Sequence, residues 1–225
     1  MSMVKLAARV RGLIEGLYAY DREEQQVEVS GRGDLIVAQG LPELTELLRQ
    51  GLSYQVSSTT GQAALTALPT TTAGLSLANG EPAVGACYAI DSFGSIEEVV
   101  DATQTDVTAI FAMLNARNSA APSAGTVETG LRSLSGRGTY GGLAVVRRGA
   151  TVVNDGWFGH GTPGAQIAPV AAGANWKVNE ALVRGLYLVP PGGAFSIQAV
   201  KAAAAAAAQQ FFFIRWHEVM VQFRT

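Results

Sequence analysis

The chain has few of the residues with which proteins usually bind metals or attack substrates. Its 225 residues include one cysteine, Cys87, and two histidines, His160 and His217. A single cysteine allows no internal disulfide and excludes zinc sites that need four cysteines. Metal-binding β-sandwiches of the cupin kind use an H-x-H pair with further ligands, and the chain has no such pair. We therefore expect no metal and no other cofactor.

Charged side chains are also scarce. They make up 15% of the chain, against roughly 25% in an ordinary soluble domain. Hydrophobic residues make up 48%, and 26 residues are glycine. A solitary monomer normally covers its surface with Lys, Arg, Asp and Glu. We therefore expect a surface of uncharged polar residues, much of which contacts other protein.

The few charges change sign along the chain. Residues 51–145 carry 3 positive and 7 negative side chains, and residues 146–225 carry 7 and 3. This asymmetry suits a subunit that orients itself against a partner, and chance scatter explains it equally well. The net charge is −2 and the basic residues are dispersed, so the pattern does not indicate a nucleic-acid binder.

Long apolar runs are missing as well. The segment Met1–Leu6 lacks the apolar core of a signal peptide, and Gly12 and Gly16 interrupt the apolar run that follows. No stretch approaches the roughly 18–20 apolar residues that span a bilayer. These features predict a soluble protein that is made in a cytoplasm and does not bind membranes.

Motifs that could carry chemistry have plainer explanations. Gly136–Gly141 matches G-x-G-x-x-G, but a strand-like segment, Leu143–Val146, follows where a pyrophosphate-binding helix would begin. There is no G-x-S-x-G motif, and Cys87 lies in an apolar run. We expect Glu97–Glu98 and Asp101 in a solvated connecting segment, although the sequence leaves open a carboxylate pair formed by the fold. The sequence predicts no enzymatic activity.

Both histidines have structural interpretations. His160 is expected in a loop over Gly159–Gly164. His217 lies in a strand pattern in which alternation places Trp216 and Glu218 on one face and Arg215 and His217 on the other. We expect both histidines to serve packing or the surface.

Residues 1–50 predict an N-terminal arm that carries one short helix. Pro42 is suited to a first helical turn and Gly51 to a terminator, so the pattern predicts a helix over 42–50. Its leucines form an apolar stripe, of which Leu44 and Leu48 are candidates for a subunit contact.

Residues 51–225 predict a β domain. Short apolar and β-branched segments alternate with Gly and Pro, which indicates an antiparallel sandwich or barrel. Residues 107–115 fit both a helix and a strand, and the context favours a strand. The expected strands include Leu75–Leu77, Ala86–Ile90, 107–115, Leu143–Val146, Ala150–Val153, 174–179, 183–189, 194–200 and 210–223. The expected turns are Asn79–Gly80, Asp91–Gly94, Arg147–Gly149, Asn154–Gly156 and Pro190–Gly193.

Three segments of the last third resemble virion proteins of tailed bacteriophages, above all the cement or decoration proteins on the outside of their capsids. The segments are Thr151–Phe158, Val189–Ser196 and Ile214–Val219. The resemblance implies a jelly-roll-like sandwich that assembles as a dimer or trimer. It also implies binding to the major capsid protein on the capsid exterior, with the arm reaching neighbouring subunits.

Aromatic residues are the expected anchors of such an interface. The candidates are Trp157, Phe158, Trp176 and Trp216, and packing in the core is the alternative for each tryptophan. Two other functions remain open. One is a phage tail or fibre component that binds a receptor, and the other is a carbohydrate-binding sandwich.

Overall fold

The computed structural model describes residues 47–48, 50–99, 107–136, 140–161, 175–201 and 209–220. Within these ranges the chain is mainly β, as predicted, and only Leu47, Leu48 and Gln50 are helical. The rest of the predicted arm, including Leu44, lies outside the described residues. In the part of the chain that is described, no helix has the length and apolar character needed to cross a membrane.

Among the described residues, twelve strands form two six-stranded sheets, in which every strand pair is antiparallel. The first sheet has the order β10-β4-β12-β1-β7, with β2 also paired to β12, and the second has the order β6-β8-β3-β11-β5-β9. The strands are β1 (Ser53–Ser57), β2 (Gln62–Ala63), β3 (Thr72–Asn79), β4 (Cys87–Val99), β5 (Val107–Asn115), β6 (Thr126–Val127), β7 (Arg132–Ser133), β8 (Ala144–Thr151), β9 (Phe158–Gly161), β10 (Asn175–Val189), β11 (Ala194–Lys201) and β12 (Gln209–Val219).

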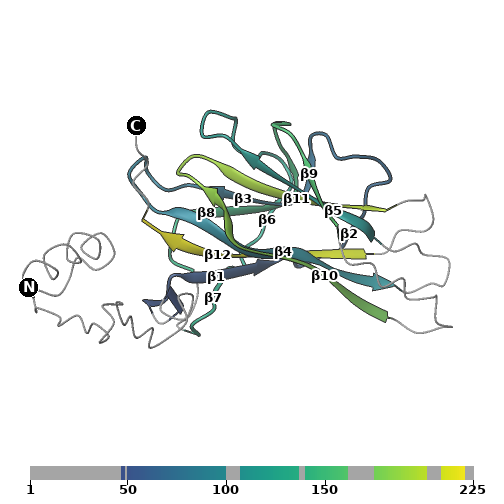
Figure 1. Cartoon of the computed structure of the whole chain (residues 1–225), viewed down its shortest axis with the longest axis horizontal. Coiled ribbons are helices and arrows are strands. Elements are labelled where there is room, and N and C mark those ends of the chain that lie inside the picture. Colours follow the sequence, from purple (N-terminus) through teal and green to yellow (C-terminus); the bar gives the residue numbers. More distant parts are fainter. Residues whose placement is uncertain are drawn as a thin grey trace, which may run out of the picture. The chain divides into compact units, whose positions relative to one another are not determined.

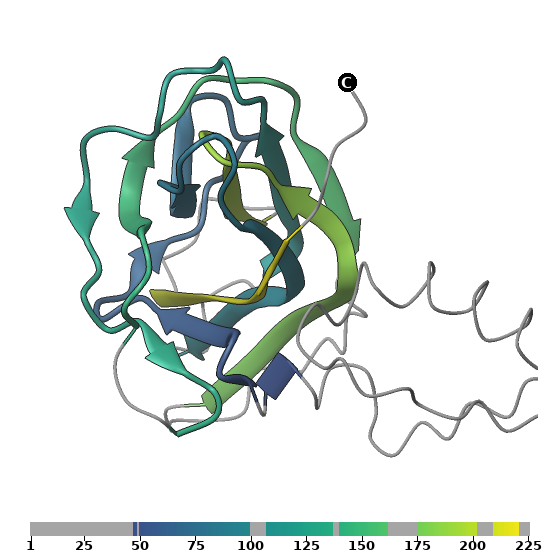
Figure 2. The same cartoon turned by 90° about the vertical axis from the view of Figure 1, so that its left-hand side faces the viewer.

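The two sheets form a sandwich with the core between them. In Figure 1 the sheet that holds β3, β8 and β11 lies above the sheet that holds β4, β12 and β1. The view turned by 90° shows the strands arranged around the core region (Figure 2). The jelly-roll connectivity that the resemblance implies stays a prediction.

Alternation along the strands builds this core. On β12, Phe212, Ile214 and Trp216 are fully buried, and Leu75 and Leu77 of β3 are buried from the facing sheet. Successive side chains of a strand point to opposite faces, so residues two apart share the inner face. Burying one large apolar side chain contributes about 1.5–3 kcal/mol, which makes this shared inner face the main source of stability.

Strands β4 and β8 run through two of the predicted turns. The predicted turn Asp91–Gly94 is wrong, because β4 continues to Val99. Asp91 is instead a bulge: β12 pairs with its neighbours Ile90 and Ser92 and skips it. The turn at Arg147–Gly149 is likewise wrong, because β8 is one strand in which Gly149 has a φ of 62°.

Strands β9 and β10 differ from the prediction in the same way. β9 covers Phe158–Gly161, where the sequence predicts the start of a loop. β10 joins the two predicted segments 174–179 and 183–189 into one strand, with an irregularity between Leu182 and Tyr187. Glycines and charged residues in these segments indicate breaks from local sequence alone, and pairing with long neighbouring strands overrides that preference.

Asn79–Gly80 is not a hairpin turn: Asn79 ends β3, and the turn lies further along, at Ala83–Val84. β3 and β4, on either side of it, belong to different sheets. The Asn79 amide donates hydrogen bonds to the carbonyl oxygens of Ala86 at 2.9 Å and Val189 at 3.0 Å. Asn79 therefore fastens the crossing from one sheet to the other.

Candidate interaction surface

Trp216 is a core residue. Its side chain has no exposed surface, and its ring centroid lies 5.8 Å from those of Tyr54 and Tyr140 and 6.2 Å from that of Tyr88. Aromatic pairs at these separations add to the energy of burial. The core alternative therefore applies to Trp216, which cannot touch a partner from this position.

Trp157 and Phe158 are half-buried and pack on the sandwich. Trp157 covers a small second cluster made of Ala73, Met113, Ala150 and Val152. Its indole nitrogen donates to the carbonyl oxygen of Thr70 at 2.8 Å. Phe158 packs against the Tyr187 ring at 5.0 Å. Both residues keep some exposed surface, so they can contribute to a contact.

The structure describes the two remaining interface candidates, Leu48 and Trp176, only in part. Leu48 is half-buried. Trp176 pairs with Glu98 through the backbone of β10, and its side chain lies outside the described residues.

The outer face of β10 exposes apolar side chains that are not among the interface candidates predicted from the sequence. Val178, Leu182 and Leu186 are 61%, 64% and 72% exposed. β10 is an edge strand of its sheet. The signal in the sequence is the spacing of four, which keeps side chains on one face of a strand. We call these three residues the β10 stripe.

One ion pair ties the β10 stripe to the middle of its sheet. Arg215 of β12 donates to the Glu180 carboxylate at 2.7 Å and to the Ser92 hydroxyl at 3.4 Å. Its guanidinium carbon lies 5.3 Å from the ring centroid of Phe213. Because Glu180 lies between Val178 and Leu182, the pair braces the stripe across β4.

A bulge marks the far end of the β10 stripe. Leu182 pairs with Ser92 and Tyr187 with Ile90, so four residues of β10 stand against the single residue Asp91. Within them Arg184 and Gly185 have φ values of 49° and 81°. A non-glycine residue in this conformation costs about 1–2 kcal/mol. Bulges bend a strand, so Leu186 sits on an exposed and bent part of the edge.

Ser53, His217 and Asp91 approach one another in an order that resembles a hydrolase triad. The Ser53 hydroxyl lies 2.7 Å from Nδ1 of His217, and Nε2 lies 4.0 Å from Asp91 Oδ1. Ser53 has no exposed surface, so no substrate can reach its hydroxyl. Burial lowers the pKa of His217, and the Asp91 charge only partly opposes this shift. The arrangement is a packing contact between three strands.

Tyr140 and Glu218 hold the glycine-rich segment against the sandwich. The Tyr140 hydroxyl donates to Glu218 at 2.6 Å and accepts from the Ala144 amide at 3.0 Å. Burial raises the pKa of Glu218, and the Tyr140 hydrogen bond opposes that shift. Burial also raises the pKa of Tyr140. The end of the G-x-G-x-x-G motif therefore serves as an attachment point.

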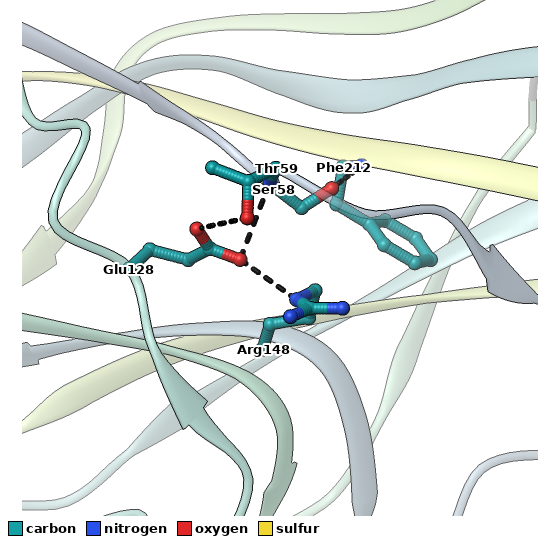
Figure 3. Close-up of polar contacts among 5 residues, drawn as sticks. All are labelled: Ser58, Thr59, Glu128, Arg148 and Phe212. Carbon is teal, nitrogen blue, oxygen red and sulfur yellow. Dashed lines mark hydrogen bonds and ion pairs between the residues drawn. The ribbon is translucent and has the colours of Figure 1, made fainter.

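The Glu128 side chain binds residues of two other segments, Thr59 and Arg148 (Figure 3). Its carboxylate accepts from Arg148 Nε at 2.7 Å, from the Thr59 hydroxyl at 3.0 Å and from the Thr59 amide at 3.3 Å. Next to it, the Ser58 hydroxyl accepts from the Phe212 amide at 2.9 Å. Thr59 follows β1, Glu128 follows β6 and Arg148 belongs to β8, so this contact links the two sheets.

His160 lies on β9 and not in a loop. Its Nε2 lies 3.0 Å from the Tyr187 hydroxyl of β10, and its ring packs edge-on against Phe93 at 5.0 Å. Burial lowers the pKa of this imidazole. A neutral histidine therefore joins the edge strands β9 and β10 of the two sheets.

Glu97 overturns a second expectation. The sequence predicts Glu97–Glu98 in a solvated connection, but both lie on β4, and Glu97 has no exposed surface. Glu98 is half-buried, and Asp101 lies outside the described residues. Cys87 is buried at the start of the same strand, which fits its position in an apolar run of the sequence.

The described residues form no group of three His, Cys, Asp or Glu side chains that could hold a metal ion. No family model, no curated protein and no solved structure matches the chain. The class that the fold defines is a two-sheet antiparallel β-sandwich. Its exposed apolar side chains include those of the β10 stripe.

Proposed function

We propose that the chain is a structural protein of a tailed-phage particle, without enzymatic activity, that binds the outside of the capsid and stabilises contacts between major capsid protein subunits. The observation that supports this most is the β10 stripe, in which three large apolar side chains on one strand are each more than half exposed. The sequence resemblance supplies the kind of particle, and the stripe supplies a surface with which to bind it.

The chemistry of the stripe suits a protein partner. A row of exposed apolar side chains with polar neighbours is typical of a protein contact, because removing apolar surface from water lowers the free energy. Its central brace, Arg215 with Glu180, offers charge-assisted hydrogen bonds at the margin of the apolar row. A stable contact buries on the order of 1,200–2,000 Å², so other surfaces of the sandwich must take part. Trp157 and Phe158 are the candidates we retain.

The proposal fixes the expected partners and location. The partners are the major capsid protein and further copies of this chain, as a dimer or trimer. Nucleic acid, membranes and cofactors are not expected to take part. The protein would be made in the cytoplasm of the host and end on the exterior of the virion.

The test is binding to phage capsids stripped of their outer proteins. Leu182→Asp places a charge in the middle of the stripe, where Leu182 is 64% exposed. Leu68→Asp is the matched control, because Leu68 is a 69% exposed leucine outside the stripe. We expect the wild type and the control to co-sediment with capsids and raise their heat resistance, and Leu182→Asp to bind at least tenfold more weakly.

Cryo-electron microscopy of the particles then decides the location. Density of this sandwich on the outer shell is the expected result. Density on the tail fibres would contradict the capsid assignment and favour the receptor-binding alternative. Equal capsid binding by Leu182→Asp and wild type would remove the stripe from the contact.

A further inference from the structure

The inner face of the sheet changes from apolar to polar along β10, β4 and β12. One level of the sheet holds Ala181, Phe93 and Ile214 side by side, all of them in or against the apolar core. The next level holds Asn179 and Ser95 beside Phe212, and the level after it holds Glu97 beside Gln210. We call Ser95, Asn179 and Gln210 the inner polar cluster.

This cluster is closed off from solvent. Ser95 and Gln210 have no exposed surface, and Asn179 keeps 4%. Two charged residues are buried at the same end of the sandwich. Glu97 of β4 is fully buried beside Gln210, and Lys201, at the end of β11 in the facing sheet, is 3% exposed.

Polar atoms of the cluster have no hydrogen-bond partner among the residues that the structure describes. They are the Ser95 hydroxyl, the Asn179 amide nitrogen, and both the nitrogen and the oxygen of the Gln210 amide. Most buried polar atoms in proteins are paired with protein or with ordered water. Four such atoms on adjacent levels of one sheet face therefore indicate a shared polar occupant.

We infer that the inner polar cluster is a binding site for ordered water inside the sandwich. The burial of all three side chains limits the occupant to a small molecule that the fold can enclose, and buried waters typically make about three hydrogen bonds to such groups. The chemistry matches. The Gln210 oxygen and the Ser95 hydroxyl can accept from water, and the two amide nitrogens and the same hydroxyl can donate to it.

The water site explains why a polar end of the core persists in a chain with few charges. Water that bridges Asn179 of β10, Ser95 of β4 and Gln210 of β12 joins three neighbouring strands below the outer face that carries the β10 stripe. The inference does not depend on the proposed function.

Two measurements test the site in the full chain. NMR on the wild type looks for magnetisation transfer between the Gln210 side-chain amide protons and long-lived water, and a high-resolution crystal structure looks for water within hydrogen-bond distance of the cluster. Both signals are expected. Absence of water beside all three side chains would overturn the inference.

The variant Gln210→Met gives an independent answer by the sign of its effect. If water fills the site, methionine leaves Ser95 and Asn179 without their bridge, and Tm falls by about 2–6 °C. If the site is dry, methionine removes two unpaired atoms, Tm rises, and the inference fails. Gln55→Met on the outer face of β1 is the control, because Gln55 is half-buried there, and its Tm is expected to change little.

Discussion

Gly74 of one sheet leaves the space into which the ring of Phe212 from the other sheet fits. A Cβ atom at position 74 would lie 2.5 Å from Cζ and 2.8 Å from Cδ2 of Phe212. Both residues are buried, and Phe212 belongs to the main core cluster. The separation of the two sheets at this point therefore depends on the missing side chain of Gly74.

Gly74→Ala is expected to destabilise the sandwich. The added methyl group forces the Phe212 ring or a strand to move, and overpacking of this kind costs about 1–3 kcal/mol. Gly141→Ala is the control, because nothing lies within 4 Å of a Cβ at that exposed position. Urea unfolding measures both variants. A neutral Gly74→Ala would show that the sheets can separate without loss.

Two ion pairs of equal length are expected to differ in their contribution to stability. Arg148–Glu128 and Arg215–Glu180 both measure 2.7 Å, but the side chains are 16% and 2% exposed in the first and 39% and 27% in the second. Glu128→Ala leaves Arg148 and Thr59 without their acceptor, and we expect a loss of about 2–4 kcal/mol. For Glu180→Ala we expect under about 1 kcal/mol. Equal losses in unfolding free energy would contradict the role assigned to burial.

Acidification is expected to weaken the fold through its two histidines. Burial lowers the pKa of both His160 and His217 in the folded state below the ordinary value of 6.5. The unfolded chain therefore binds protons first, and stability falls as the pH drops from 6.5 through the folded-state pKa values. Urea unfolding at pH 7.5 and 5.5 measures the loss. His160→Gln should show a smaller difference between the two pH values than wild type, and an unchanged difference would exclude His160 as a cause.

Glu218 is expected to act in the opposite direction. Burial raises its pKa above 4.5 in the folded state, so its contribution is fully present below pH 4.5 and is lost as the pH rises through the folded-state pKa. The difference in unfolding free energy between Glu218→Gln and wild type should therefore depend on pH. The variant should compare less favourably with wild type at pH 4.5 than at pH 7. Tyr140→Phe removes the hydrogen bond that lowers this pKa, so an NMR titration of that variant should show a still higher pKa for Glu218. A lower value would contradict the assignment.

The sequence predicts the elements that depend on local signals. The turn at Pro190–Gly193 and the strand over 107–115 are confirmed. For residues 107–115 the local pattern fits a helix and a strand equally, and pairing of β5 with β11 and β9 resolves it. Local preference suffices where a turn has rigid chemistry, and neighbouring strands decide where it does not.

The polar contacts depend on residues that are distant in the sequence, and local patterns do not reveal them. Glu97 is placed opposite Gln210 by the pairing of β4 with β12, and nothing in the run of charges around it indicates an inner face. His160 is flanked by glycines that resemble a loop, but β5 holds this segment as a strand. The β10 stripe could be predicted from the sequence, because its three apolar residues are spaced by four and an even spacing favours one face of a strand.

The position of β12 affects how the chain folds during its synthesis. Among the described strands it comes last in the sequence, yet it lies between β4 and β1 in the middle of its sheet. β1 and β4 meet only through it. A ribosome must therefore release residues 209–219 before the sheet can close, and until then the inner faces of β1 and β4 stay open to chaperones or to association with other nascent chains.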